Sequence, residues 1–475
     1  MASNRVTFGE WLPDQPGVIG ALTNARNVYP RLTGYGPFPS EASYSGNASE
    51  TLNSIVAARS TAGTTQVFAG GNSKLFKVNA TTLELDNVSA TTYSTTTKWR
   101  YTQFGNALIA ANGANTLQVY DLTTTGNFAT LSSAAPKAKY VTVVRDFVVS
   151  ASTTANPFRV QWSGINDETV WTTTSTSQSD FQDIPDGGNI QGITGGEFGL
   201  VLMERSIVRM SYVGTPLIFQ FDNIARNLGC YEPNSIVQWQ GITYFLADDG
   251  FYSCNGQQIV PIGAEKVNRT FFDDLEESLF ESISTAVDPT RNLIMWCYPS
   301  VSTGYRILVY HVSTQKWSYA TTTVNGIATS ATLSATMESL DSYSTSIDAL
   351  ESSLDARIWM GGKVNLVGYQ NSKIVTFTGQ AKTATIETSD LETSNNKSMI
   401  TLARPLVDNG SGSVAIASRQ LLSETPVFGS YRAADSEGRI GIRSLGRFHR
   451  LSLQPSGEWT SAIGIDVEMQ SAGMR

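Results

Sequence analysis

Two histidines, His311 and His449, are the first candidates for catalysis, because imidazole is the usual general base near neutral pH. A Ser-His-Asp triad would need one of them. His311 lies in LVYHVST and His449 in GRFHRLSL, both predicted strands, and no GxSxG motif accompanies either. HExxH and GxxxxGK[ST] motifs are missing too, and no GxGxxG follows a strand. We therefore expect structural histidines in a protein that is not an enzyme and needs no cofactor.

Carboxylate pairs beside aromatic residues would suit a glycoside hydrolase. The candidates are Asp167, Glu168 and Trp171 in WSGINDETVW, and Glu458 with Trp459. The first segment is similar to the Asp-box of sialidases, but its spacing differs by one residue, the central Gly is missing, and it does not repeat. We expect Trp171 in the core and Asp167 in a turn.

Metal ligands are sparse in the sequence. Asp180, Asp183 and Asp186 in SDFQDIPDGG could supply oxygens to calcium, but neither EF-hand nor RTX spacing supports such a site. The three cysteines form no CxxC pair, which argues against a thiolate zinc site and against a disulfide framework: Cys230, Cys254 and Cys297. We predict a polar loop, no bound metal and a reducing cytoplasm.

Two charged clusters have no catalytic pattern. The densest acidic stretch comprises Asp273, Asp274, Glu276, Glu277 and Glu281. A basic cluster near the C-terminus comprises Arg439, Arg443, Arg447 and Arg450. A solvated surface is the ordinary role of both. Our hypotheses are that the acids line a channel and that the arginines bind carboxylates of a neighbouring subunit or another protein.

Composition narrows the class of protein. The chain has 475 residues, 41% of them hydrophobic, 10% aromatic and 16% charged, which excludes a disordered chain. The 33 basic and 41 acidic residues give a net charge of −8, without the basic surplus of a protein that grips DNA phosphates. The sequence has no run of 18 apolar residues and begins with MASNRVTFGEW, so we expect neither a membrane-spanning segment nor a secretory signal.

Seven hairpins must position whatever site exists. Each joins two apolar strands through a Gly, Asn or Asp turn, and their starts lie 39 to 65 residues apart. They are predicted at Val67–Val78, Ala107–Tyr120, Asp146–Trp162, Phe198–Tyr212, Ile242–Ile259, Asn292–Tyr310 and Arg357–Tyr369. This spacing is typical of propeller blades. We predict an all-β fold with a propeller of about seven blades, six to eight, and keep a β-sandwich array as the alternative.

Segments outside the hairpins complete the predicted organisation. We predict that residues 1–50 form an extended arm, that residues 51–379 form the propeller, and that residues 380–475 form a separate C-terminal β domain. Within 268–286, the apolar positions Phe272, Leu275, Leu279 and Ile283 predict a short amphipathic helix. Residues 331–355 also have helical spacing and are predicted to project as an insertion, with a Ser-rich loop as the alternative.

An ordered series of segments resembles the tail-hub or nozzle proteins of short-tailed bacteriophages, the family that includes packaged-DNA stabilisation proteins. The segments are ARNVYP (25–30), WRYTQFGNALIA (99–110), DFVV (146–149), QWSGIND (161–167), YVGTPLIF (212–219), FLADDGFY (245–252), RFHRL (447–451) and GMR (473–475). They cover nearly the whole chain, and none of them is a catalytic motif.

The resemblance implies a propeller-like β subunit in a homo-oligomer, a hexameric ring below the portal and its adaptor, or head-tail connector. Such a ring extends the channel for double-stranded DNA and carries tail fibre or tailspike proteins. It would belong to the virion tail and be assembled in the bacterial host cytoplasm. The acidic balance suits a conduit that DNA passes without sticking. The alternative function is a sugar-binding, lectin-like or glycoside-hydrolase propeller acting on the bacterial surface.

Overall fold

The computed structural model describes residues 3–95, 97–174, 176–333, 346, 362–392 and 397–472. Strands account for 53% of the chain and helices for 4%, so the protein is all-β, as predicted. In the described residues no helix has the length and apolar character needed to cross a membrane.

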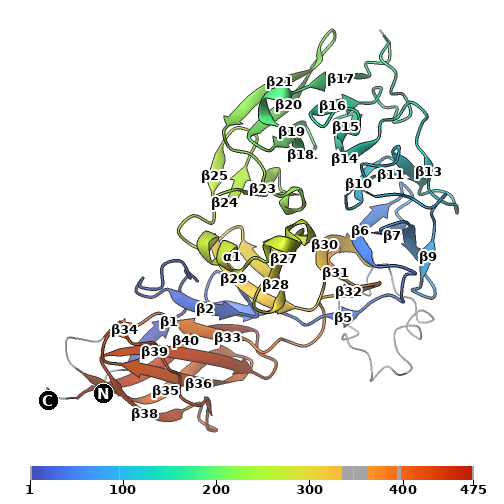
Figure 1. Ribbon diagram of the computed structural model, residues 1–475. Helices are drawn as coiled ribbons and strands as arrows, with labels where there is room; N and C mark the ends of the chain where they lie inside the picture. Colours follow the sequence, from blue (N-terminus) through green and yellow to red (C-terminus); the bar gives the residue numbers. More distant parts are fainter. Residues whose placement is uncertain are drawn as a thin grey trace.

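Six antiparallel sheets of four strands each follow one another along a curved path (Figure 1). The first sheet contains β6 (Leu52–Arg59), β7 (Thr65–Gly71), β8 (Leu75–Val78) and β9 (Leu85–Asn87), and the second contains β10 (Arg100–Phe104), β11 (Ala107–Ala111), β12 (Gln118–Asp121) and β13 (Ala129–Thr130). The third contains β14 (Ala138–Val144), β15 (Phe147–Thr153), β16 (Arg159–Trp162) and β17 (Asp180–Asp183), and the fourth contains β18 (Ile190–Thr194), β19 (Phe198–Met203), β20 (Ser206–Gly214) and β21 (Ile218–Arg226). The fifth contains β22 (Val237–Trp239), β23 (Ile242–Ala247), β24 (Gly250–Cys254) and β25 (Ile259–Pro261). The sixth contains β30 (Gly326–Ala331), β31 (Val364–Gln370), β32 (Lys373–Thr376) and β5 (Ala42–Ser43).

A ten-stranded sheet lies between the fifth and the sixth of these in chain order. It begins with β26 (Ser284–Asp288), β27 (Leu293–Ser300), β28 (Gly304–His311) and β29 (Lys316–Thr322). It then continues through β2 (Leu22–Arg26), β33 (Thr385–Thr388), β39 (Phe448–Ser456), β36 (Ser411–Arg419) and β37 (Arg432–Ala433), while β34 (Leu391–Glu392) pairs with β39. One sheet therefore joins the curved array to the C-terminal residues.

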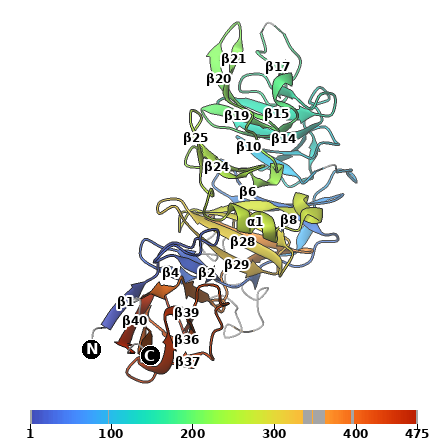
Figure 2. The same ribbon diagram turned by 60° about the vertical axis from the view of Figure 1, so that its left-hand side comes forward.

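A six-stranded sheet lies beside the C-terminal part of the ten-stranded one. It comprises β3 (Val28–Pro30), β4 (Tyr35–Pro37), β40 (Ser461–Ser471), β35 (Ser398–Asp408), β38 (Ile440–Gly446) and β1 (Ser3–Thr7). Figure 2 shows this layer at the end of the molecule opposite β17 and β21. The first fifty residues thus supply strands to three sheets, and β1 pairs with β40 close to both chain ends.

Six of the seven predicted hairpins are present, each as the second and third strands of a sheet. The seventh, predicted at 357–369, is wrong in position. Residues 364–370 form β31, whose two edges are occupied by β30 and β32, so the hairpin spans 364–376 instead. Its turn contains Asn371 at φ 54°, a left-handed conformation that Asn tolerates well.

The first strands of neighbouring sheets contact one another in sequence. β30 contacts β6, β6 contacts β10, β10 contacts β14 and β14 contacts β18, while β22 contacts β26 and β26 contacts β30. The fourth and fifth sheets are linked by the hydroxyls of Thr194 and Thr243 at 3.2 Å and by Gln238, which donates to the Gly195 carbonyl. Every neighbouring pair among the seven sheets is therefore in contact.

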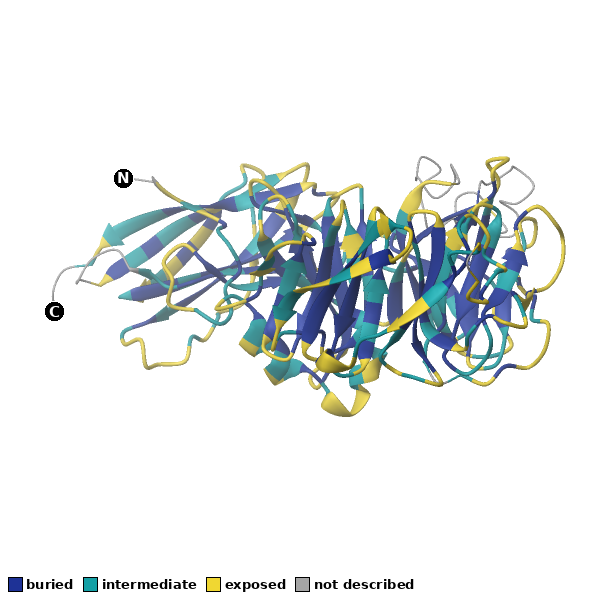
Figure 3. Ribbon diagram, turned by 90° about the horizontal axis from the view of Figure 1, so that it is seen from above, coloured by how far each residue is buried: buried dark blue, intermediate teal, exposed yellow. Residues whose placement is uncertain are grey.

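Buried residues concentrate in the strands and exposed residues in the loops (Figure 3). Apolar side chains fill the spaces between the sheets. The largest apolar core extends from β24 through the ten-stranded sheet to β40. Its centre is an aromatic cluster in which Phe251 lies 4.8 Å from Trp296 and 5.5 Å from Trp317, measured between ring centroids. Burial of such large side chains is the main favourable term in folding.

The single amphipathic helix predicted within 268–286 is not formed. Helix α1 (Asn268–Asp274) is followed by Leu275, whose backbone is extended and forms a β-bridge with Ser300. A short 3₁₀ helix, η3 (Glu277–Ser282), comes next. The Glu276 N–H donates to the Pro299 carbonyl, so the edge of β27 captures the chain between the two helices. Tertiary pairing overrides the helical spacing here. Two further short helices in the described residues are η1 (Pro185–Gly187) and η2 (Pro233–Ser235). The insertion predicted at 331–355 lies outside the described residues, apart from residues 331–333 and Ser346.

Candidate functional site

Two adjoining cavities lie between the first strands of the seven sheets. One, of about 370 Å³, is lined by residues of β6, β10, β22, β26 and β30. The other, of about 230 Å³, is lined by residues of β10, β14, β18 and β22. Arg100 and Gln238 line both, so we treat them as one central cavity. All seven first strands contribute to its wall.

A third hollow of about 380 Å³ shares Lys98, Arg100 and Asn234 with the central cavity, and we call it the mouth. Further residues around it include Lys139, Gln191, Tyr231, Glu232, Phe280 and Glu281. These side chains come from β10, β14 and β18 and from the segments around η2 and η3. The mouth therefore collects charged and aromatic groups from three sheets and from two segments that lie outside strands.

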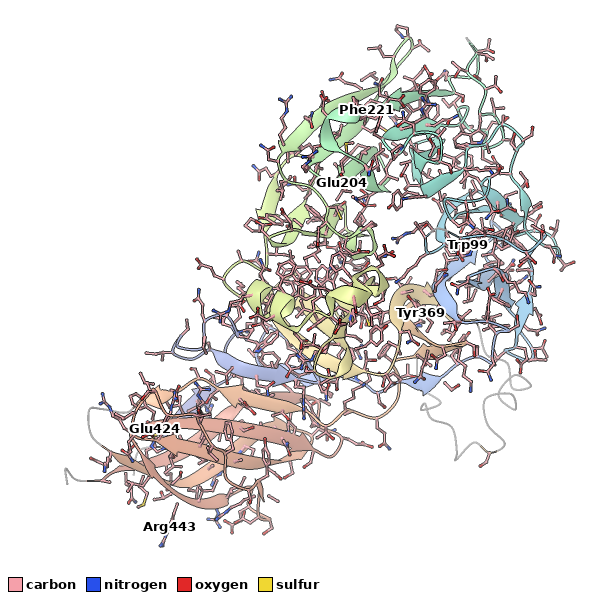
Figure 4. The ribbon with its side chains drawn as sticks, viewed as in Figure 1. Trp99, Glu204, Phe221, Tyr369, Glu424 and Arg443 are labelled. Carbon is pink, nitrogen blue, oxygen red and sulfur yellow. The ribbon has the colours of Figure 1, made fainter. Side chains whose placement is uncertain are left out.

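Local sequence explains why two cations share this place. Lys98 and Arg100 flank Trp99 at the start of β10, and alternate residues of an extended chain point to opposite sides. Trp99 is buried against Tyr93, and its indole N–H donates to the Gly71 carbonyl at 3.0 Å. Figure 4 labels Trp99, beside the sheet that begins with β10, and Tyr369 on β31, and the sheet that begins with β6 lies between those two sheets. Burial of the indole thus leaves the side chains of Lys98 and Arg100 lining the central cavity.

Lys98 is held by neutral acceptors. Its Nζ donates to the carbonyls of Ser282 and Ile283 at 3.0 and 2.9 Å and to the Tyr369 hydroxyl at 3.4 Å. Burial, together with the positive charge of Arg100, lowers the pKa of Lys98 to about 8. The ammonium has no ion pair with a described carboxylate within 4 Å.

Arg100 is only partly bound. Its Nη2 donates to the Pro233 carbonyl at 3.2 Å and to Asn234 Oδ1 at 2.6 Å. A guanidinium carries five N–H groups in a fixed fork, and Nη2 supplies two of them. No described residue accepts a hydrogen bond from Nε or Nη1. Neither nitrogen is among the buried atoms that lack a hydrogen-bond partner. This edge of Arg100 therefore remains available at the cavity surface.

Two carboxylates belong to the mouth. Glu232 is buried, and its Oε1 accepts from the backbone N–H of Asn234 at 2.9 Å and from Asn234 Nδ2 at 2.6 Å. Burial raises the pKa of Glu232 despite these hydrogen bonds. Glu281 is exposed, and its backbone carbonyl accepts from Asn234 Nδ2. Of the five predicted channel acids, Glu281 is the one that borders the mouth.

An aromatic pair completes the mouth. The rings of Tyr231 and Phe280 lie 4.7 Å apart, and Tyr231 is 54% exposed. The described lining of the mouth and the central cavity contains neither histidine nor cysteine. Its groups are hydrogen-bond donors, cations and ring faces, which are suited to holding a ligand.

The remaining predicted acids divide into two kinds. Asp273 and Glu277 are exposed, and Glu276 accepts from the Ser278 hydroxyl. Asp274 instead pairs with Arg306 at 3.1 Å and accepts from the hydroxyls of three more residues: Tyr298, Ser300 and Ser302. The side chain of Asp274 is 12% exposed, so its carboxylate is bound within the protein and does not face an open channel.

The predicted interface arginines also differ among themselves. Arg450 and Arg419 both pair with Asp390, at 2.8 and 2.5 Å. Arg439 pairs with its neighbours Asp435 and Glu437.

The other two arginines of the cluster lie close together on β38 and just beyond it. Arg447 stacks on Phe448, with its guanidinium carbon 5.0 Å from the ring centre. Arg443 lies on β38 at the edge of the six-stranded sheet, is exposed, and points away from the molecule (Figure 4). Arg443 is thus the member of the cluster best placed to reach another chain.

The histidines occupy separate environments. His449 is fully buried between two hydroxyls, with Nε2 2.9 Å from Ser398 Oγ and Nδ1 2.6 Å from Ser418 Oγ. His311 accepts from the Thr314 N–H through Nδ1 at 3.2 Å. Burial lowers the pKa of both imidazoles. Neither has a carboxylate among its assigned hydrogen-bond partners, so no described triad forms.

The glycosidase and calcium candidates have local partners. Asp167 accepts from the N–H and hydroxyl of Thr169 in a turn, and Trp171 is buried, as expected. Asp183 forms a bidentate pair with Arg159 at 2.7 and 2.8 Å. In the described part of the chain, no three His, Cys, Asp or Glu residues gather in a way that would hold a metal ion.

Sequence reasoning missed the group that matters most, Lys98 and Arg100. The signal was present in the segment KWRY, where two cations flank a tryptophan, although no strand was predicted there. Tyr231 and Phe280 carry no such signal, because they are 49 residues apart and meet only in the fold. No protein-family model matches the chain, and no curated protein is found to be similar to it.

Proposed function

We propose that this protein is a structural virion protein, the nozzle or hub ring of a short bacteriophage tail. The observation that carries the proposal is the ten-stranded sheet, which fuses the curved array and the C-terminal sheets into one body. Two segments of the family resemblance from opposite ends of the chain, residues 25–30 and 447–451, overlap the end of β2 and the start of β39 in that sheet. A continuous sheet without a flexible linker suits a part that must bear load.

The seven sheets are, in this proposal, the blades of a closed propeller. The unbroken order of contacts between their first strands supports closure, as does the central cavity bordered by all seven. The last blade is completed by β5 from the N-terminal residues, which pairs with β32. Such a joint between early and late segments is a natural way to fasten a ring of sheets.

The DNA conduit of this proposal lies between subunits. The central cavity measures about 370 Å³ and 230 Å³ in its two parts. The major groove of B-DNA alone is about 12 Å wide, so a duplex is far too large to thread through one copy. A hexameric ring of copies would enclose the channel instead, with the exposed Asp273 and Glu277 as candidate lining acids.

The remaining parts of the proposal follow from this role. The adaptor and the tail fibre or tailspike proteins are its partners, the virion tail is its location after assembly in the host cytoplasm, and no enzymatic activity is needed. Arg443 is the candidate contact to a neighbouring subunit or tail protein, because planar guanidinium groups bind carboxylates bidentately.

Electron microscopy and light scattering of the purified full chain test the proposal. We expect sixfold rings whose mass is six times the 51.3 kDa chain. Addition of portal–adaptor complexes from a short-tailed phage should place these rings at the adaptor end. A stable monomer that never forms rings, at any protein concentration or in the presence of such complexes, would contradict it.

A further inference from the structure

The mouth has cations that form no ion pair within the described protein. Lys98, Arg100 and Lys139 border it, and none of the three forms an ion pair within 4 Å in the described structure. Two groups also lack an assigned acceptor among the described residues: the Nε and Nη1 edge of Arg100, and the ammonium of Lys139. An unpaired cation in a partly enclosed cavity is unfavourable unless an anion accompanies it.

Charge around the mouth indicates how much negative charge a ligand would bring. Three cations face two carboxylates, Glu232 and Glu281. The surplus is a single positive charge. One ligand carboxylate would neutralise this charge, whereas a doubly charged phosphate would leave the mouth with a net negative charge. Glu232 is already occupied by Asn234, whereas Glu281 is exposed at the rim and free to accept from ligand hydroxyls.

Ring faces indicate the rest of the ligand. The exposed ring of Tyr231 beside Phe280 offers an apolar surface to a ligand that carries C–H groups on one face. Gln191 adds an amide at the same hollow, whereas the Asn234 amide is already bound by Arg100, Glu232 and the Glu281 carbonyl. A cavity of about 380 Å³ is within the range for small-molecule sites. Carboxylate recognition, one amide and the exposed Glu281 for hydroxyls, and a ring platform together match a sugar acid.

We propose that the mouth binds a uronic-acid unit. Arg100 and Lys139 would hold its carboxylate, and the Tyr231–Phe280 pair would contact the face of its ring. This inference goes beyond the tail role and does not depend on it, because the site is contained within one copy of the chain. Acidic polysaccharide bearing such units is the ligand class that it assigns.

The test uses the purified full chain with D-glucuronic acid and with glucuronamide, its neutral counterpart of the same shape, titrated by saturation-transfer NMR. We expect the acid to bind and the amide to bind at least about tenfold more weakly, because a charged hydrogen-bonded pair is lost. Equal binding of the two, or binding of neither, would overturn the proposal. Displacement of the acid by equimolar acetate would identify an anion site without sugar recognition and would overturn it as well.

Variants separate the two halves of the site. Arg100→Lys keeps the charge but loses the fork, and we expect a drop in affinity of about tenfold. Tyr231→Ala should weaken the acid and the amide alike, because it removes the ring surface. Arg443→Gln, far from the mouth, is the matched control and should leave binding unchanged. Unchanged affinity in both Arg100→Lys and Tyr231→Ala, with thermal midpoints like that of the parent chain, would also contradict the assignment.

Discussion

Asp273 and Asp274 are adjacent carboxylates with opposite surroundings. Asp273 is exposed at the end of α1, whereas Asp274 is bound by Arg306 and by hydroxyls from β27 and the turn that follows it. The sequence alone does not distinguish the surroundings of these two residues, because both belong to one acidic stretch. Both lie in the last turn of α1, where consecutive side chains point about 100° apart, so Asp274 faces β27 while Asp273 faces solvent.

This contrast gives a paired prediction. Asp274→Asn should lower the free energy of unfolding by about 2–3 kcal/mol, because it leaves a poorly exposed Arg306 without its counter-charge. Asp273→Asn is the matched control and should change stability by no more than about 0.5 kcal/mol. Urea titration followed by tryptophan fluorescence measures both. Equal effects of the two substitutions would show that the Asp274 pair contributes nothing particular.

Lys98 leads to a prediction about pH. Its pKa is lowered to about 8 in the folded protein, while an exposed lysine in the unfolded chain titrates near 10.4. Between these values the unfolded chain binds more protons at this site, so this site makes the folded state more stable as pH rises. Lys98→Met lacks that gain.

The difference in stability between the parent chain and Lys98→Met is the quantity to measure, because other titrating groups cancel in it. We expect the parent to gain up to about 3 kcal/mol relative to the variant between pH 8 and pH 10.5. Chemical unfolding at a series of pH values provides the data. A difference that stays flat across this window would mean that Lys98 titrates normally.

At the level of elements, Asn27 connects three strands. It lies between β2 and β3 with φ 58°, and it is 6% exposed. Its Oδ1 accepts from the Thr321 N–H at 2.8 Å, and its Nδ2 donates to the Thr383 carbonyl at 2.9 Å. One side chain thus holds the N-terminal residues against β29 and the segment that leads into β33.

We expect Asn27→Ala to lower the unfolding free energy by about 2–4 kcal/mol, since it removes two buried hydrogen bonds and strains a left-handed position. Asn27→Gly keeps the backbone conformation and should cost less than the alanine variant. Thermal unfolding monitored by circular dichroism distinguishes them. If glycine proved as harmful as alanine, the backbone conformation would have no part in the loss.

Elements were predictable where the signal was local. Six hairpins were located because an Asn, Asp or Gly turn between apolar strands is read within about a dozen residues. The ten-stranded sheet was not, since Leu22 pairs with Thr388 and Arg26 lies beside Tyr319. No turn motif or periodicity in the sequence indicates that a strand pairs with another strand some 300 residues away. The candidate site suffers from the same problem: KWRY is visible in the sequence, but its convergence with Tyr231 and Glu281 is not.

At the scale of the whole molecule, the proposed ring predicts an effect on assembly. Arg443→Glu should weaken ring formation, because an exposed guanidinium at a sheet edge would be replaced by a repelling carboxylate. Arg205→Glu makes the same change of charge at another exposed position and serves as the control. Light scattering over a range of protein concentrations measures the ring. Indistinguishable assembly of the two variants would remove Arg443 from the interface.

The proposed conduit predicts an effect on DNA. Asp273→Lys combined with Glu277→Lys should slow DNA ejection from complete particles, most strongly at low salt, where charges are screened least. Asp274 is left intact in this variant because its replacement would also affect stability. Asp408→Lys combined with Glu458→Lys makes the same change of charge at two exposed positions of the C-terminal part and is the control. Ejection rates that match the control at every salt concentration would argue against these acids facing the channel.

The pairing of early and late segments has a consequence for how the protein is made. The strands β6 to β25 find their partners nearby in sequence and can form sheets while the ribosome is still elongating the chain. β1, β2 and β5 cannot, because β40, β33 and β32 leave the ribosome hundreds of residues later. The nascent chain therefore carries β1, β2 and β5 without these partners until most of it has been synthesised. A ribosome that stalls before residue 370 would release a chain with open sheet edges, a ready substrate for chaperones and for aggregation.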